Sequence, residues 1–138
     1  MKLDIGCGRK KREGYIGIDT AKNSDADIIA SALYLPVRDS VVDEISCSHL
    51  LEHLYPEEAQ KFFDEISRVL KEGGEARLKI DRDWTKRRLL NKDPSHKYRY
   101  KKQEIEKMVT RFKTRKVESK IYRFGRSIRN KIFVELVE

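Results

Sequence analysis

The sequence has few of the residues that hold small secreted domains together or anchor a chain in a membrane. Only two of its 138 residues are cysteine, Cys7 and Cys47, and only three are proline. It shows no signal peptide, no low-complexity linker and no run of 18 apolar residues. These absences exclude a disulfide scaffold and favour a soluble, cytoplasmic protein without a membrane contact, in which both cysteines are reduced.

Amide side chains are also scarce, whereas charge is plentiful. Three Asn and two Gln stand against 39% charged residues, a balance common in hyperthermophile proteins. The length lies near the usual size of one domain and leaves no room for a separate substrate domain. We therefore expect residues 1–138 to form a single domain.

Glycine is sparse as well, but two of the seven glycines lie one residue apart at the end of an apolar run. Residues 3–8 read Leu-Asp-Ile-Gly-Cys-Gly, and a second apolar run, residues 15–19, ends at Asp19. Two parallel strands are predicted. Glycines there let the backbone approach a ligand, and an acid after the next strand accepts hydrogen bonds from ribose hydroxyls. The pattern indicates a site for an adenosine-containing cofactor, and a tight strand-to-loop turn is the alternative.

A dinucleotide site requires a third glycine, and Lys10 and Lys11 occupy that region. Residues 3–8 instead resemble motif I of the class I S-adenosylmethionine-dependent methyltransferases, with Asp19 as the acid after the second strand. Further segments resemble the same family in the same order: residues 35–45, residues 46–54, and residues 68–74 with the strand that follows. Together these segments cover residues 3 to 80.

The resemblance implies a Rossmann-like α/β fold with a doubly wound, seven-stranded, mostly parallel sheet, one antiparallel strand and helices on both faces. It implies S-adenosyl-L-methionine as cofactor and methyl transfer to an acceptor that the sequence does not identify. The residues expected to bind the cofactor follow the first four strands: Asp4, Gly6, Cys7, Gly8, Arg9, Asp19, Thr20, Ser31, Ala32, Leu33 and Ser46.

Two features depart from the family pattern. Only residues 9–14 separate the first two strands, so the first crossover helix must be short or missing. One edge of the cofactor site should then be open and lined by the cations of residues 9–12. In addition, Ser31 stands where the family often has an Asp that recognises the adenine amino group.

The remaining elements are predicted from periodicity. Residues 26–32 form a third strand, and a helix opens at Pro56 and continues to Gly73-Gly74. A strand follows over residues 75–80. Apolar residues between 105 and 112 mark one helical face, and residues 117–122 and 132–137 form a closing antiparallel pair.

His49 is the candidate catalytic residue because it lies just after the fourth strand, at the edge where such sheets bind ligands. It would accept a proton from an oxygen or nitrogen nucleophile. A packing or helix-capping histidine is the alternative, and Asp81 and Asp83 occupy a similar edge position after the fifth strand.

His49, Glu52 and His53 also have metal-ligand spacing on one helical face. A Glu-x-x-Glu-His segment binds a divalent ion in methyltransferases similar to the ubiquinone-biosynthesis and small-RNA 2′-O-methylating enzymes, but His49 replaces the first Glu here. The Glu-His pair is widespread in relatives that use no metal. We therefore expect a structural role and no metal.

Charge divides the chain into two halves. Residues 1–80 carry a net charge of −3 and residues 81–138 a net charge of +11. Trp84, Tyr98 and Tyr100 are interleaved with cations, a pattern that suits RNA or another anionic partner. A solvated basic surface with core aromatics is the alternative. A non-catalytic basic module that binds nucleic acid or supports a partner enzyme is the alternative function.

Overall fold

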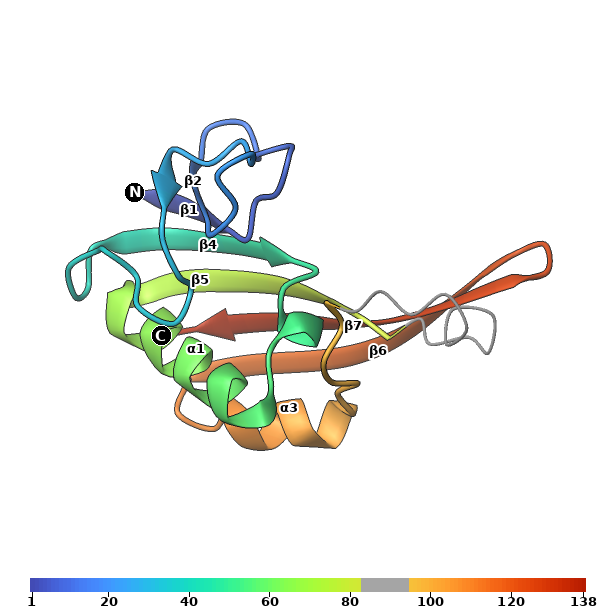
Figure 1. Ribbon diagram of the computed structural model, residues 1–138. Coiled ribbons are helices and arrows are strands. Elements are labelled where there is room, and N and C mark those ends of the chain that lie inside the picture. Colours follow the sequence, from blue (N-terminus) through green and yellow to red (C-terminus); the bar gives the residue numbers. More distant parts are fainter. Residues whose placement is uncertain (83–94) are drawn as a thin grey trace.

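The computed structural model describes residues 1–82 and 95–138, apart from the side chains of residues 124 and 127. It contains one seven-stranded sheet with the strand order β3-β2-β1-β4-β5-β7-β6 (Figure 1). The strands are β1 Lys2–Ile5, β2 Ile16–Asp19, β3 Ile28–Ile29, β4 Val42–Ser48, β5 Leu70–Asp81, β6 Thr114–Phe124 and β7 Ser127–Val137. The helices are η1 Leu51–His53, α1 Pro56–Val69 and α3 Lys102–Met108.

The strand order is that of a doubly wound, mostly parallel sheet, as predicted. Strands β3 to β5 pair in parallel, and β7 inserts antiparallel between β5 and β6. The chain reverses its direction across the sheet between β1 and β4, and the crevice at such a switch point is where open α/β sheets bind ligands. The carboxyl ends of β1, β2 and β4 therefore define the place to look for a site.

Helix α1 is the main support of the sheet. Pro56 opens it, and Glu58 accepts a hydrogen bond from the backbone N–H of Tyr55 at 3.0 Å. Its apolar residues recur at helical spacing and are fully buried: Ala59, Phe62, Phe63, Ile66 and Val69. Each large side chain among them contributes roughly 1.5 to 3 kcal/mol by its burial. Among the described residues, no helix is both long enough and apolar enough to cross a membrane.

The two described α-helices lie on one face of the sheet (Figure 1). They touch, since Gln60 of α1 donates to the Met108 carbonyl of α3 at 3.3 Å. Along β5, Leu78 and Ile80 point to this face and are buried, whereas Arg77 and Lys79 point to the other. The sequence led us to expect helices on both faces. The described helices cover only one, because the connections before β2 and before β4 contain none.

The first crossover is a loop that lies flat on the opposite, polar face. Residues 6–15 form turns and no helix, which confirms the predicted missing helix. Gly17 of β2 makes this possible, because a Cβ there would lie 2.8 Å from the Lys11 side chain and 3.0 Å from the Cys7 sulfur. A glycine inside a strand often marks such a close approach.

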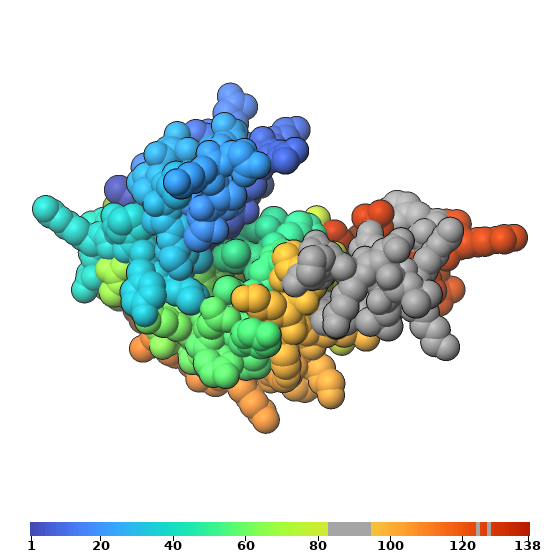
Figure 2. Space-filling view, in the orientation of Figure 1, coloured from blue at the N-terminus to red at the C-terminus, as the bar shows by residue number. Residues whose placement is uncertain are grey.

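Several element boundaries differ from the sequence prediction. Strand β3 has only two residues. Helix α1 ends at Val69, and β5 begins directly at Leu70 instead of after the Gly73-Gly74 pair. The β6–β7 hairpin is longer at its turn end than predicted, because a two-residue turn with Gly125 at a φ of 56° continues the pairing beyond the apolar core. The hairpin tip projects to one side of the molecule (Figures 1 and 2).

Candidate functional site

The loop after β1 is shaped by its two glycines. Gly6 and Gly8 have φ angles of 69° and 61°, which residues with a side chain rarely adopt. The Gly6 N–H donates to the Ile18 carbonyl at 2.8 Å, which ties the loop to β2. A Cβ built on Gly8 would meet nothing within 4 Å, so this part of the backbone faces open space. The loop is therefore exposed for contact with a ligand, as motif I predicts.

Asp19, at the end of β2, is joined to this loop. One carboxylate oxygen accepts the Gly8 N–H at 2.9 Å, and the other accepts the Ala21 N–H at 2.9 Å. Each oxygen keeps a further lone pair for a ribose hydroxyl. The neighbouring Thr20 is exposed. The two backbone bonds fix the carboxylate in place before any ligand arrives.

Asp4 and Ser46 lie side by side on β1 and β4, on the polar face of the sheet. Both are largely buried. Asp4 accepts the Arg12 N–H at 2.8 Å, and the Arg12 guanidinium donates to the Ser46 hydroxyl at 3.2 Å. Both residues therefore anchor the crossover loop.

A pocket of about 670 Å³ opens between this crossover, the glycine loop and the end of β4. Its wall contains Asp4, Gly6, Cys7, Gly8, Lys10, Lys11, Arg12, Glu13, Ser46, Ser48 and His49. The structure thus places the predicted open, cationic edge in this pocket, with Lys10, Lys11 and Arg12 in its wall. Arg9 is exposed and does not line it.

Ser31, Ala32 and Leu33 lie outside that pocket, on the connection between β3 and β4. All three are half-buried, and the Ser31 hydroxyl accepts the Leu33 N–H at 3.1 Å. The Ser31 O–H can still donate to a ligand. Gly8 lines the pocket and donates to the Asp19 carboxylate, and the Asp19 carbonyl accepts the N–H of Ala30, the residue before Ser31, at 3.0 Å.

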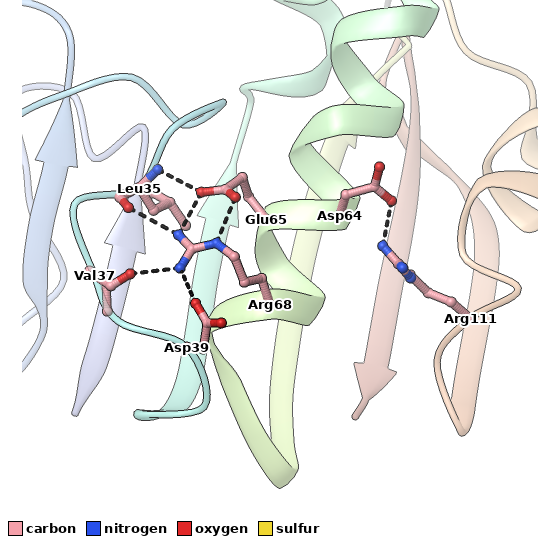
Figure 3. Close-up of polar contacts among 7 residues, drawn as sticks. All are labelled: Leu35, Val37, Asp39, Asp64, Glu65, Arg68 and Arg111. Atoms are coloured by element: carbon pink, nitrogen blue, oxygen red, sulfur yellow. Dashed lines mark hydrogen bonds and ion pairs between the residues drawn. The ribbon is translucent and has the colours of Figure 1, made fainter.

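Arg68 of α1 holds the connection that carries Ser31 (Figure 3). Its guanidinium donates to the backbone carbonyls of Leu35 and Val37 at 3.1 and 2.8 Å, and it forms ion pairs with Asp39 and Glu65. The Arg68 guanidinium holds the pKa of the Glu65 carboxyl below its usual range. Arg68 is a positioning residue that the sequence analysis did not single out. Its signal was its place at the start of the family segment formed by residues 68–74.

His49 occupies the end of β4 in a strained conformation. Its φ is 60°, a value uncommon outside glycine, and its N–H donates to the Lys79 carbonyl at 2.8 Å. The side chain is 42% exposed and lines the pocket. Such strain concentrates at functional sites. His49 therefore faces the space in which an acceptor would lie, as the candidate base must.

Glu52, beneath His49, is the most unusual buried group. It is 1% exposed, and neither carboxylate oxygen has a hydrogen-bond partner among the described residues. The His49 Nδ1 lies 3.5 Å from one of these oxygens. Two groups of possible ligands meet at Glu52, one with His49 and Asp81 and one with His53 and His96, each with its ligand atoms within 4.8 Å of one another. Imidazole and carboxylate are donors that suit a divalent cation. Asp83 lies outside the described residues.

Both cysteines are free thiols. Cys47 is buried, and burial raises the pKa of its thiol well above the ordinary value. Burial and the nearby Asp19 carboxylate also raise the pKa of the Cys7 thiol. Each thiol is therefore protonated at neutral pH and is a weak nucleophile.

Comparison with known proteins agrees with this geometry. The family model described as "Methyltransferase domain" matches residues 3–78. No curated protein matches the chain. Among solved structures, a SAM-dependent methyltransferase from Archaeoglobus fulgidus is 19% identical with a TM-score of 0.77, covering 99% of this chain and 85% of its own.

Two further structures show the same fold. A SAM-dependent methyltransferase from Methanosarcina mazei is 21% identical with a TM-score of 0.71, over 99% of this chain and 91% of its own. Phosphoethanolamine N-methyltransferase 2 of Haemonchus contortus, in complex with phosphomonomethylethanolamine and S-adenosylhomocysteine, is 15% identical with a TM-score of 0.79. The match covers 99% of this chain but only 48% of the Haemonchus chain. The chain therefore belongs to the methyltransferase domain family and has the fold of the class I S-adenosylmethionine-dependent methyltransferases.

Proposed function

We propose that the chain transfers the methyl group of S-adenosylmethionine to an anionic acceptor bound in the pocket beside the glycine loop. One observation carries the proposal: a pocket of about 670 Å³ is lined by the glycine loop on one side and by His49 on another. A cofactor held by the glycine loop and a proton acceptor at His49 would therefore face the same space.

The reaction would be an in-line displacement. A lone pair of the acceptor forms a bond to the methyl carbon, the carbon–sulfur bond breaks, and its electrons stay on sulfur as S-adenosylhomocysteine leaves. Because the sulfonium supplies its own activation, the protein has to align the reactants and exclude water. Alignment alone can contribute about 7 to 11 kcal/mol in well-oriented systems.

Residues of the glycine loop and of the ends of β2 and β4 would bind the cofactor and accept the proton. Asp19 would accept hydrogen bonds from the ribose hydroxyls, and Gly6 and Gly8 would let the backbone approach the cofactor. His49 would take the proton that an oxygen or nitrogen nucleophile loses. The Ser31 hydroxyl, or a backbone group beside it, would contact the adenine.

The anionic character of the acceptor is inferred from the pocket wall. Lys10 is exposed there, and the Arg12 guanidinium contacts only the neutral Ser46 hydroxyl and the Tyr15 ring among the described residues. Lys11 is paired with Asp27. The Haemonchus enzyme, which shares the fold, was solved with the phosphorylated phosphomonomethylethanolamine. RNA and phosphorylated metabolites both supply such a group.

The test is transfer of tritium from methyl-labelled S-adenosylmethionine into separated RNA, protein and small-molecule fractions of a cell extract. Label should accumulate in one fraction with wild-type protein and fall at least ten-fold with Asp19→Ala. Nucleic-acid binding without label in any fraction, and without affinity for S-adenosylhomocysteine, would instead support a non-catalytic module.

A further inference from the structure

The polar face of the sheet carries an aromatic ring between cations where β5, β7 and β6 meet. Phe133 of β7 lies directly opposite Lys79 of β5, and the Lys79 Nζ lies 5.9 Å from the centre of its ring. Lys120 of β6 approaches the same ring to 5.2 Å. Tyr122 contacts Phe133 edge to face, with 6.4 Å between ring centres. Two aromatic rings and two ammonium groups thus form one connected surface.

The same surface continues along the projecting hairpin. Residues 119–131 contain five cations and no acidic residue. Lys120 lies opposite Lys131, and Tyr122 lies opposite Arg129. Glu118 lies directly opposite Phe133 and forms an ion pair with Lys120 at 3.5 Å, and Asp81 lies opposite Lys131. With Glu118 included, residues 118–131 still carry a net charge of +4, which favours a partner that supplies negative charge.

This arm extends past the edge of the sheet that holds the candidate site. Strand β5 ends at Asp81, level with Lys131, whereas the hairpin continues to its turn at Gly125. Its free part has four residue pairs, so it extends about 13 Å beyond that edge. In Figure 1 it is the red and orange projection.

The arm and the pocket share one face of the sheet. Ser48, in the pocket wall, lies directly opposite Lys79, and Lys79 lies opposite Phe133. Two strand spacings, or about 10 Å, separate β4 from β7. A chain molecule lying along the arm could therefore place one unit in the pocket.

Two of the three aromatic residues that could contact RNA, Tyr98 and Tyr100, are held in contacts within the protein. Tyr100 is fully buried and donates its hydroxyl to the Leu54 carbonyl at 2.6 Å, and Tyr98 packs on it and bonds Glu104. Trp84, Arg87 and Arg88 lie outside the described residues. Among the described residues of the basic half, a surface for a polyanion is therefore expected away from Tyr98 and Tyr100.

We infer that the hairpin arm, comprising Lys79, Lys120, Tyr122, Arg129, Lys131 and Phe133, binds single-stranded nucleic acid and leads it to the pocket. Aromatic rings flanked by cations bind stacked bases and their phosphates together, whereas a duplex does not present its bases for stacking. The inference rests on the proposed function, because it names the class of acceptor for the same pocket.

The test measures binding of a fluorescein-labelled 20-nucleotide poly-U RNA, with poly-dT of equal length and a 20-base-pair RNA duplex for comparison. Anisotropy is recorded at 50 and 200 mM salt. Both single strands should bind more tightly than the duplex, and preference for one of them identifies RNA or DNA. Equal or tighter binding of the duplex would overturn the inference.

Three variants locate the surface. Lys120→Gln with Arg129→Gln should lower the magnitude of the log–log salt slope by about 1.4, because each contact to a single strand contributes roughly 0.7. Tyr122→Leu should weaken binding roughly ten-fold by removing a stacking ring. Arg38→Gln with Lys107→Gln removes the same charge elsewhere and should leave the slope unchanged. An equal effect of both double variants would overturn the inference.

Calorimetry with S-adenosylhomocysteine separates this inference from the proposed function. The arm variants should bind S-adenosylhomocysteine as the wild type does. If the wild type binds this ligand but no oligonucleotide below 10 μM, the arm inference fails and the proposed function stands. If the wild-type protein sediments with phosphatidylserine vesicles and binds no oligonucleotide, the arm inference is also overturned. If the wild-type protein binds oligonucleotide but not S-adenosylhomocysteine, the proposed function fails.

Discussion

The backbone N–H of Gly8 donates a hydrogen bond of 2.9 Å to the carboxylate of Asp19. This bond joins the two features that the sequence places 11 residues apart, the glycine loop after β1 and the acid after β2. In families with a longer crossover, a helix separates these strands, but here a loop does so. Asp19 therefore supports the loop that it would also use to bind a ligand.

Replacing Asp19 should affect binding more than folding. Asp19→Ala removes the ribose acceptor and should weaken S-adenosylhomocysteine ten-fold or more, while the lost backbone bonds lower the free energy of unfolding by about 1 to 2 kcal/mol. Asp19→Asn keeps one oxygen that can accept the Gly8 N–H. It should therefore recover much of the lost free energy of unfolding but not the affinity for S-adenosylhomocysteine. Asp64→Ala, on the exposed surface, serves as control. Unchanged affinity in Asp19→Ala would refute the assignment.

Arg68 and Arg111 offer a matched pair of arginines on neighbouring surfaces (Figure 3). Arg68 contacts two backbone carbonyls and two carboxylates, whereas Arg111 forms one ion pair with Asp64 in which both side chains are about half exposed. Arg68→Lys should lower the free energy of unfolding by about 1 to 3 kcal/mol, because an ammonium cannot reach all four partners. Arg111→Lys should change it by about 0.5 kcal/mol or less. Urea denaturation compares them, and equal losses would contradict the role of Arg68.

Tyr100 should make the protein sensitive to alkali. Burial raises the pKa of its hydroxyl well above the ordinary value, near 10 in unfolded chains. The native state then holds a proton that the unfolded state loses, so stability is full below pH 10 and falls as the pH rises further. Tyr100→Phe should show a smaller loss of unfolding free energy between pH 8 and pH 10.5 than the wild type. Parallel losses in both proteins would show that Tyr100 does not titrate on unfolding.

The buried Glu52 carboxylate should lower the free energy of unfolding of the wild-type protein. Both of its oxygens are buried without a hydrogen-bond partner among residues 1–82 and 95–138, and an amide costs less to bury than a carboxylate. We expect Glu52→Gln to raise the free energy of unfolding by about 1 kcal/mol or more in metal-free buffer. A less stable variant, together with a wild type that added Zn²⁺ stabilises, would contradict this and assign a cation to Glu52.

Much of the fold followed from local patterns in the sequence. The glycine loop, the acid at Asp19 and the apolar spacing of α1 each depend on residues close together in the chain, and the structure confirms the order in which they occur. The short first crossover was visible as a count of residues between two strands. Its consequence, a pocket over Asp4 and Ser46, follows from the sheet register.

The features that were missed depend on contacts between distant segments. Arg68 bonds residues about 30 positions away, and Gly17 makes room for Lys11 on the opposite side of a turn. The full length of the β6–β7 hairpin was missed because its outer part lacks the alternation of apolar and polar residues that marks a strand packed on a core. For Tyr100 the sequence left two alternatives open, a contact with RNA and a place in the core, and only the packed structure shows that it is buried.

Isothermal titration of the folded wild-type chain with S-adenosylhomocysteine tests the central claim most directly. The arrangement of Gly6, Gly8 and Asp19 predicts saturable binding of one molecule per chain, weakened at least ten-fold by Asp19→Ala. A folded wild-type protein that gives no saturable heat with this ligand would contradict the claim that the glycine loop and Asp19 form a cofactor site.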